Sequence, residues 1–359
     1  MSLATEKAAE PSFPWRSRGR RATVDTLLAP WEEFRRVIPL VSLKSLLARP
    51  NPSVPKVAVL MCTMQGQHFL AEQLNSIATQ THPRWAIWAS DDGSDDHTHA
   101  ILEYYQSHWG EDRISIHAGP AEGSTANFLS LTCRADIDAD YFAYADQDDI
   151  WESDKLERAV NWLKTVPEDV PALYGSRTLL VDARNQHIGY SPLFEREPSF
   201  RNALVQSIAG GNTMVFNRAA RDLLRQAGEN VEAVTHDWWA YMLVSSCGGR
   251  VHYDPYPTVR YRQHGSNQFG SNASPLAQLK RARLLLRGRF RGWVDANLNA
   301  LARVRHMMTP ESLQVLDEFT RARQRSLLTR LLGLRRAGIF RQTLLGNIGL
   351  LMAALINRL

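Results

Sequence analysis

Cysteine is scarce in this chain of 359 residues, which contains only Cys62, Cys133 and Cys247. Three widely separated thiols in apolar surroundings argue against a disulfide-stapled secreted fold and against metal ligation by cysteine. The beginning of the sequence also lacks the apolar core of a signal peptide and instead carries a basic string at residues 16–21. We therefore expect reduced thiols and a cytoplasmic protein.

Two glycine-rich phosphate motifs are missing. Neither Gly-x-Gly-x-x-Gly nor Gly-x-x-x-x-Gly-Lys-Ser/Thr occurs at a strand end, so a dinucleotide-dependent oxidoreductase and a P-loop enzyme lose their main support. A nucleotide-binding sheet without these motifs needs another way to hold phosphate. Carboxylates at a strand end provide one, because they bind Mg²⁺ or Mn²⁺ and the cation bridges them to a diphosphate.

A hydrophobic run long enough to span a bilayer is absent from the C-terminal part of the chain. Residues 344–356 are mostly apolar but number only thirteen, whereas a spanning helix needs about 20. We expect a helix that lies on a membrane surface, with Arg330, Arg335, Arg336 and Arg341 before it. A helix packed on the rest of the protein is the alternative.

The net charge of the chain is +5, but this charge is distributed unevenly along the sequence. Residues 1–50 carry +4, residues 51–274 carry −11 and residues 275–359 carry +12. An acidic centre is a poor surface for nucleic acid, which we do not expect as a partner, whereas basic ends suit an anionic membrane. The sequence therefore favours a peripheral protein at the inner face of the cell membrane.

The centre of the chain alternates apolar runs with amphipathic segments. The apolar runs predict strands at residues 57–62, 85–89, 114–117 and 141–144. Helical spacing predicts helices at residues 69–77, 99–108 and 128–134. This order indicates an α/β protein with a doubly wound, nucleotide-binding sheet, whose ligands bind at the carboxyl ends of the strands.

The remainder of the chain is less regular and suggests three regions. Further elements are predicted as a helix at 156–163, strands at 172–175, 178–182 and 209–216, a turn at 185–189 and a helix that begins near His236. A proline-dense stretch at 49–55 and basic helical segments from 275 onward mark the boundaries. We expect an N-terminal extension at 1–55, disordered to about residue 22 and helical over 24–48, a main domain at 56–274 and a helical region at 275–359.

Two acidic turns stand at predicted strand ends. Asp146, Asp148 and Asp149 follow the strand at 141–144, and the turn Ser90–Asp96 follows the strand at 85–89. Crowded carboxylates repel one another and raise each other's pKa, which a divalent metal or solvent offsets. The alternatives are a metal site and a solvated acidic loop, and the second acidic turn favours the metal site.

These turns resemble those of glycosyltransferase family 2, the inverting nucleotide-sugar enzymes with a GT-A fold. The match covers residues 57–267 and rests on Ser90-Asp91-Asp92-Gly93-Ser94, on Ala145-Asp146-Gln147-Asp148-Asp149-Ile150-Trp151 and on His236-Asp237-Trp238-Trp239. Asp154–Glu157 and Tyr261–Gly265 are similar to the rhamnosyltransferase-like branch that builds bacterial surface polysaccharides. The first turn of the family usually reads Thr-Tyr-Asn, and here it is Thr63-Met64-Gln65.

The resemblance implies a role for each matching residue. It places Asp91 on the pyrimidine with Asp92 beside it, Asp146 on the ribose and the metal, Asp148 as the main metal ligand, and Asp237 as the catalytic base. His264 corresponds to a histidine that often completes the metal shell in this fold. Thr63, Asn127, Lys155 and Arg262 are further candidates for donor binding.

The expected activity is transfer of a sugar, rhamnose or a relative of it, from a TDP- or UDP-linked donor to a glycan or a polyprenyl-linked acceptor, with Mg²⁺ or Mn²⁺. Two alternatives stay open. A nucleotidyltransferase would use the same acidic strand end but needs a basic phosphate loop, and residues 63–67 contain no basic residue. A non-catalytic GT-A-fold binding protein would tolerate loss of the carboxylates that this chain retains.

Overall fold

The computed structural model describes residue 51, residues 53–264 and residues 289–359, and these lie in one compact unit. Nearly all of the predicted N-terminal extension lies outside the described residues, together with its predicted disordered and helical parts. The predicted boundary at 274–275 lies outside them as well.

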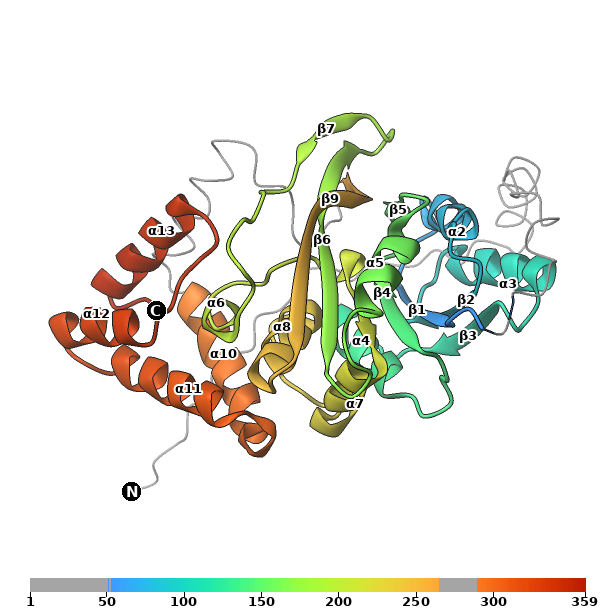
Figure 1. The fold of residues 1–359 in the computed structure, drawn as a ribbon. Helices are drawn as coiled ribbons and strands as arrows, with labels where there is room; N and C mark the ends of the chain where they lie inside the picture. Colours follow the sequence, from blue (N-terminus) through green and yellow to red (C-terminus); the bar gives the residue numbers. More distant parts are fainter. Residues whose placement is uncertain (1–50, 52, 265–288) are drawn as a thin grey trace, which may run out of the picture. The chain divides into compact units, whose positions relative to one another are not determined.

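Nine strands form one mixed sheet in the described part of the chain (Figure 1). Their order in the sheet is β3-β2-β1-β4-β8-β6-β9-β5, and β7 pairs with β6. The strands are β1 (Val57–Thr63), β2 (Trp85–Asp91), β3 (Ile114–Ala118), β4 (Tyr141–Ala145), β5 (Ile150–Trp151), β6 (Ala172–Asp182), β7 (His187–Tyr190), β8 (Val215–Asn217) and β9 (Arg250–Gln263).

Helices connect the strands and follow the sheet. Those of the sheet region are α2 (Leu70–Ala78), α3 (Thr98–Trp109), α4 (Ser124–Cys133), α5 (Lys155–Leu163), α6 (Phe200–Ala203), α7 (Arg218–Ala227) and α8 (His236–Ser246), with the 3₁₀ turn η2 (Gly211–Thr213). Those that follow it are α10 (Arg289–Arg303), α11 (Pro310–Arg323), α12 (Leu327–Arg336) and α13 (Leu344–Leu355), with the 3₁₀ turn η3 (Arg305–Met307).

The parallel half of the sheet confirms the α/β prediction. β1 lies between β2 and β4, parallel to both, and β3 continues the parallel order beyond β2. Every residue of β1 is buried, as expected for a parallel strand that is covered on both faces. The four strands and three helices predicted for this half are present, with ends within a few residues of the prediction.

The second half differs from the prediction in several ways. β5, β7, α6 and α7 were not predicted, and β7 takes up part of the turn expected at 185–189. β6 is one strand of eleven residues rather than two, bulged between Ser176 and Thr178. The glycine-led strand expected at 209–216 is instead the 3₁₀ turn η2 followed by the short strand β8. β9, which runs parallel to β6 over most of its length, was not predicted as a strand.

The C-terminal helices share the hydrophobic core of the sheet region. Phe290, Phe319, Leu334 and Ala353 belong to the same cluster of buried residues as Leu60 of β1. No helix in the described ranges is long and apolar enough to cross a membrane.

Candidate active site

Four candidate segments converge at the carboxyl edge of the parallel strands. Thr63 and Asp91, the last residues of β1 and β2, are partners in the sheet register. Ala145 ends β4 beside β1, so the acidic turn from Asp146 to Asp149 begins at the same edge. The charge of Asp237, in the first turn of α8, acts on Asp146.

Asp91 lies in a closed turn. Its carboxylate accepts hydrogen bonds from Thr63 Oγ1 at 2.7 Å, from Ser94 Oγ at 2.7 Å and from the Ser94 backbone N–H at 2.9 Å. Gln147 fixes the turn after β1. Its side-chain oxygen accepts the Met64 N–H at 2.8 Å, and its side-chain nitrogen donates to the Met64 carbonyl at 2.7 Å. Gln147, which the sequence did not single out, therefore joins the first turn to the acidic turn.

Asp92 and Asn127 are both committed to the segment that leads into α4. The two oxygens of Asp92 accept the backbone N–H groups of Ala121 and Gly123 at 2.7 and 2.8 Å. Asn127 is buried, and its amide bonds the hydroxyl and the carbonyl of Ser90 at 2.6 and 3.0 Å. Both side chains thus fix the position of the loop before α4.

Four carboxylates interact at the centre of the edge. Burial raises the pKa of Asp146, and the charges of Asp148 and Asp237 raise it further. Burial also raises the pKa of Asp149, with contributions from Asp148 and Asp146, while a hydrogen bond from Asn212 opposes this effect. The carboxylate of Asp237 thus lies close enough to the acidic turn to act on Asp146.

Asp148 and His264, two of the three predicted metal ligands, lie side by side. The Oδ2 atom of Asp148 lies 2.7 Å from Nε2 of His264, and both side chains are partly exposed. The His264 ring packs against Phe69, with ring centroids 5.0 Å apart. In the ranges that the structure describes, no group of three or more His, Cys, Asp or Glu side chains is arranged to hold a metal.

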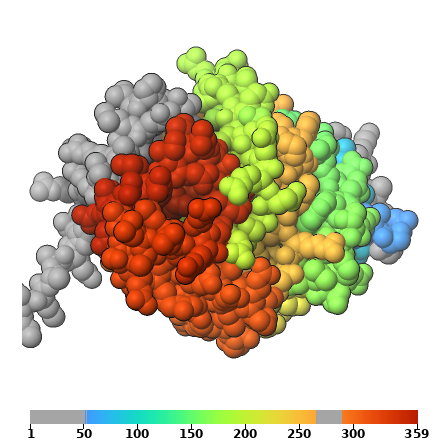
Figure 2. All heavy atoms as spheres, turned by 60° about the vertical axis from the view of Figure 1, so that its left-hand side comes forward, coloured from blue at the N-terminus to red at the C-terminus, as the bar shows by residue number. Residues whose placement is uncertain are grey.

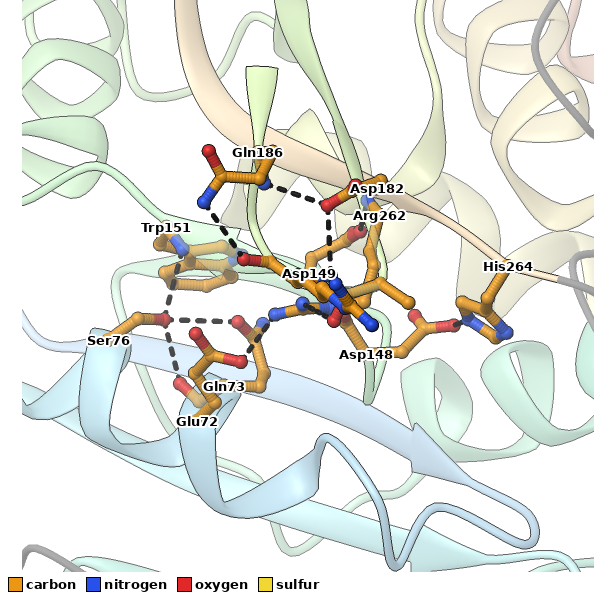
Figure 3. A network of polar contacts seen from close by, with 12 residues as sticks. Glu72, Gln73, Ser76, Asp148, Asp149, Trp151, Asp182, Gln186, Arg262 and His264 are labelled. Atoms are coloured by element: carbon orange, nitrogen blue, oxygen red, sulfur yellow. Dashed lines mark hydrogen bonds and ion pairs between the residues drawn. The ribbon is translucent and has the colours of Figure 1, made fainter. Parts of the chain in front are cut away.

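Arg262 braces the acidic turn from the end of β9 (Figure 3). Its backbone N–H donates to Asp149, and its Nε donates to the Asp148 carbonyl at 2.9 Å. Its remaining nitrogens donate to the Ala183 carbonyl and to the Glu72 carboxylate, and its guanidinium lies 4.5 Å from the centre of the Phe69 ring. The side chain is buried, so its position makes it a support for the turn.

Lys155 is buried near Asp149. Burial lowers its pKa to about 7, although the charge of Asp149 acts in the opposite direction. Its ammonium lies 3.9 Å from the centre of the Trp151 ring, and among the described residues it has no hydrogen-bond partner. Lys155 is therefore buried next to Asp149 of the acidic turn and is not exposed to solvent.

Asp237 faces the glycine turn that precedes β8. Its Oδ2 accepts the Gly211 N–H at 3.1 Å, and its Oδ1 accepts the backbone N–H of Trp238 at 2.6 Å. The adjacent His236 is buried and stacked on Phe128 with centroids 3.9 Å apart, and burial lowers its pKa to about 4. A Cβ at Gly211 would lie 2.3 Å from His236 Nε2, so this turn requires glycine.

Comparisons with known proteins identify the family. The Glycosyl transferase family 2 profile matches residues 58–224. The dTDP-rhamnosyl transferase RfbG of Shigella flexneri is 30% identical over 255 residues, which cover 67% of this chain and 84% of that protein. The chain belongs to glycosyltransferase family 2. Its mixed sheet flanked by helices is the GT-A arrangement expected from the sequence.

Other proteins similar to this glycosyltransferase either match a smaller part of the chain or have a lower sequence identity. The putative glycosyltransferase EpsE of Bacillus subtilis is 33% identical over 112 residues, or 31% of this chain and 40% of that protein. The structure of S. aureus TarS 1–349 with UDP-GlcNAc matches 79% of this chain and 89% of that chain, at 15% identity and a TM-score of 0.48. The nucleotidyltransferase and the non-catalytic protein gain no support from these comparisons.

The position of Arg262 leads to a prediction about stability. Replacing Arg262 with Met leaves buried carbonyl and carboxylate oxygens without their donor, so we expect the free energy of unfolding to fall by about 2–4 kcal/mol. The control is Glu72→Gln, which keeps an acceptor oxygen on a side chain that is 46% exposed, and it should cost less than about 1 kcal/mol. Chemical denaturation measures both, and equal small losses would refute the bracing role of Arg262.

Proposed function

We propose that this glycosyltransferase moves rhamnose from a TDP-linked donor, with inversion, to a hydroxyl of a glycan or polyprenyl-linked acceptor during synthesis of a surface polysaccharide. The observation that supports the proposal is that Asp148 and Asp237 both act on Asp146 at one strand edge, where Asp148 also contacts His264. The choice of sugar follows the Shigella relative, which is named a dTDP-rhamnosyl transferase. We assign this activity to residues 56–274.

The donor base is assigned to the turns after β1 and β2. Asp91 is partly exposed and preorganised by Thr63 and Ser94, so its carboxylate can accept a further hydrogen bond from a pyrimidine N–H. Asp92 and Asn127 act on the donor through the loop before α4 that they hold. Arg262 and Lys155 act through the acidic turn that lies against them.

The donor diphosphate is assigned to a Mg²⁺ or Mn²⁺ ion held by Asp148 and His264, with Asp146 beside them. A carboxylate and an imidazole are suitable ligands for such ions, and Mg²⁺ is usually bound by one or two protein groups together with phosphate oxygens and water. A two-residue site thus fits a cation that arrives with its nucleotide. When bound, the cation neutralises charge on the departing diphosphate.

Asp237 is assigned as the general base. The acceptor hydroxyl oxygen forms a bond to the anomeric carbon while the bond from that carbon to the diphosphate oxygen breaks, and the hydroxyl proton passes to the Asp237 carboxylate. The Gly211 N–H and the start of α8 hold this carboxylate in place. Because the nucleophile and the leaving group lie on opposite faces of the carbon, the configuration inverts.

The first prediction from this proposal concerns the metal. We expect turnover to stop in EDTA and to return with Mg²⁺ or Mn²⁺, and we expect Asp148→Asn to lose both activity and Mn²⁺ binding while remaining folded. Asp154→Asn is the charge-matched control, because Asp154 lies before α5 and makes only a weak ion pair with Arg158 at 3.8 Å. Full turnover in EDTA would contradict the metal assignment.

The second prediction concerns Asp237→Asn. This change keeps an oxygen for the Gly211 N–H but removes the basicity, so transfer should fall by at least about a hundredfold while donor binding is retained. Glu232→Gln, which removes an exposed charge four residues before α8 begins, should transfer normally. Single-turnover transfer and calorimetric donor binding report on the two effects, and near-normal transfer by Asp237→Asn would leave the base unassigned.

We also propose that residues 275–359 attach the enzyme to an anionic membrane. One face of α13 exposes an apolar stripe, Leu344, Leu345, Ile348, Leu351, Met352 and Leu355, while Leu350, Ala353 and Ala354 on the other face are buried. α12 and α13 are drawn in orange-red and red in Figure 2. A helix of twelve residues is too short to span a bilayer but can lie in its surface.

Basic residues near the apolar stripe suit anionic headgroups, with one correction. Arg335 and Arg336 are exposed at the end of α12. Arg330, which was expected beside them on the surface, is buried instead and donates to the carbonyls of Ala354 and Arg325 at 2.8 and 2.9 Å. It therefore joins α12 to α13 and does not face a membrane.

A membrane prediction follows from the apolar stripe. The variant Leu344→Ser, Leu345→Ser, Leu351→Ser should bind phosphatidylglycerol-containing vesicles at least about tenfold more weakly, because three large apolar groups no longer enter the bilayer. The control replaces three other exposed apolar residues, Ile188, Tyr190 and Leu193, with Ser and should bind normally. Cosedimentation measures both, and equal binding by the two variants would contradict attachment through α13.

A further inference from the structure

A charged pocket lies among the C-terminal helices, formed by residues that the glycosyl transfer does not use. It has a volume of about 360 Å³ and is lined by Arg291, Asp295, Arg323, Arg330, Asn357 and Leu359, among others. These side chains come from α10, from the end of α11, from α12 and from the segment after α13. None of them is a candidate for donor or acceptor binding.

The pocket carries more positive than negative charge. Its three guanidinium groups face one carboxylate, that of Asp295, which lies 2.6 Å from Arg323 and 3.8 Å from Arg291. Asp295 pairs with Arg323, Arg291 is 48% exposed, and the guanidinium of Arg330 has only carbonyl oxygens as hydrogen-bond partners among the described residues. Arg330 is buried, and a buried charge is costly unless an anion accompanies it.

Two of the arginines also hold buried donors that the protein does not use. The terminal nitrogens of Arg330 donate to carbonyls, and one terminal nitrogen of Arg323 pairs with Asp295. Yet the Nε of each is buried and, in the described part of the chain, has no hydrogen-bond partner. Arg330 is 8% exposed and the Arg323 side chain 9%, so bulk water reaches these groups poorly.

We propose that this pocket binds the phosphate group of a membrane lipid. Guanidinium groups bind phosphate oxygens through paired, charge-assisted hydrogen bonds, and three of them line this pocket beside a single carboxylate side chain. The volume accommodates a phosphate. A lipid is its source because the pocket includes residues that follow directly after α13, whose apolar stripe we assign to the bilayer. Only this choice of source rests on the membrane attachment proposed above.

The test uses the full chain and three soluble probes. These are geranyl phosphate, which carries both the phosphate and an apolar tail, geraniol, which carries the tail alone, and inorganic phosphate. Calorimetry should show that geranyl phosphate binds and that geraniol binds at least about tenfold more weakly, since it forms no charge-assisted hydrogen bond. Equal binding of geraniol would overturn the phosphate site, and equal affinity for inorganic phosphate would overturn the assignment to a lipid.

Variants locate the binding. The double variant Arg291→Gln, Arg323→Gln should bind geranyl phosphate at least about tenfold more weakly than the unaltered protein. The control, Arg335→Gln with Arg336→Gln, removes the same charge from exposed positions at the end of α12 and should bind normally. The single variant Arg291→Gln, at a side chain that is 48% exposed, keeps the Arg323–Asp295 pair and should weaken binding in a folded protein.

Equal weakening in the pocket variants and in the control would overturn the pocket and leave general charge attraction. Hydrolysis of the nucleotide-sugar donor by the unaltered protein tests the proposed function separately. Failure of the phosphate site would therefore not imply failure of the proposed glycosyl transfer, and the reverse also holds.

Discussion

Repulsion among the carboxylates that follow β4 is the constraint on which the site depends. Burial and the charge of Asp148 raise the pKa of both Asp146 and Asp149, so the turn is stable only where other groups offset this crowding of carboxylates. The end of β9 supplies those groups, since Arg262 bonds the turn and His264 pairs with Asp148. The mixed half of the sheet therefore completes a site whose carboxylates come mainly from the parallel half.

Burial of the strand faces explains which strands the sequence could predict. β1, β2 and β4 are continuous apolar runs because both their faces are buried, and such runs are recognisable from the sequence. β9 was missed because Pro255 and Pro257 interrupt it and its residues are mostly partly exposed. Proline within a run normally argues against a strand, but here the pairing with β6 shifts register around these residues.

The candidate site shows a similar division. Asp146, Asp148, Asp237 and His264 were chosen from motif resemblance, and the structure brings them to one edge. Residue type alone could not separate groups that face a ligand from groups that hold the loops around it. Asp92, Asn127 and Arg262 fall in the second class because their polar atoms bond the protein. Gln147 and Glu72 were missed because their partners lie far away in the sequence.

Hydrogen bonds connect α8, the helix that carries the candidate base, to the C-terminal region through α6. Asp237 and Tyr241 lie on α8, and the Tyr241 hydroxyl bonds Asn202 of α6 at 3.0 Å. Asn202 in turn donates to the carbonyl of Phe340, between α12 and α13, at 3.1 Å. Arg201, its neighbour in α6, donates to the Ala337 carbonyl. α6 therefore links α8 to the segment between α12 and α13, so under the membrane attachment proposed above it would also set the orientation of α8 relative to the membrane.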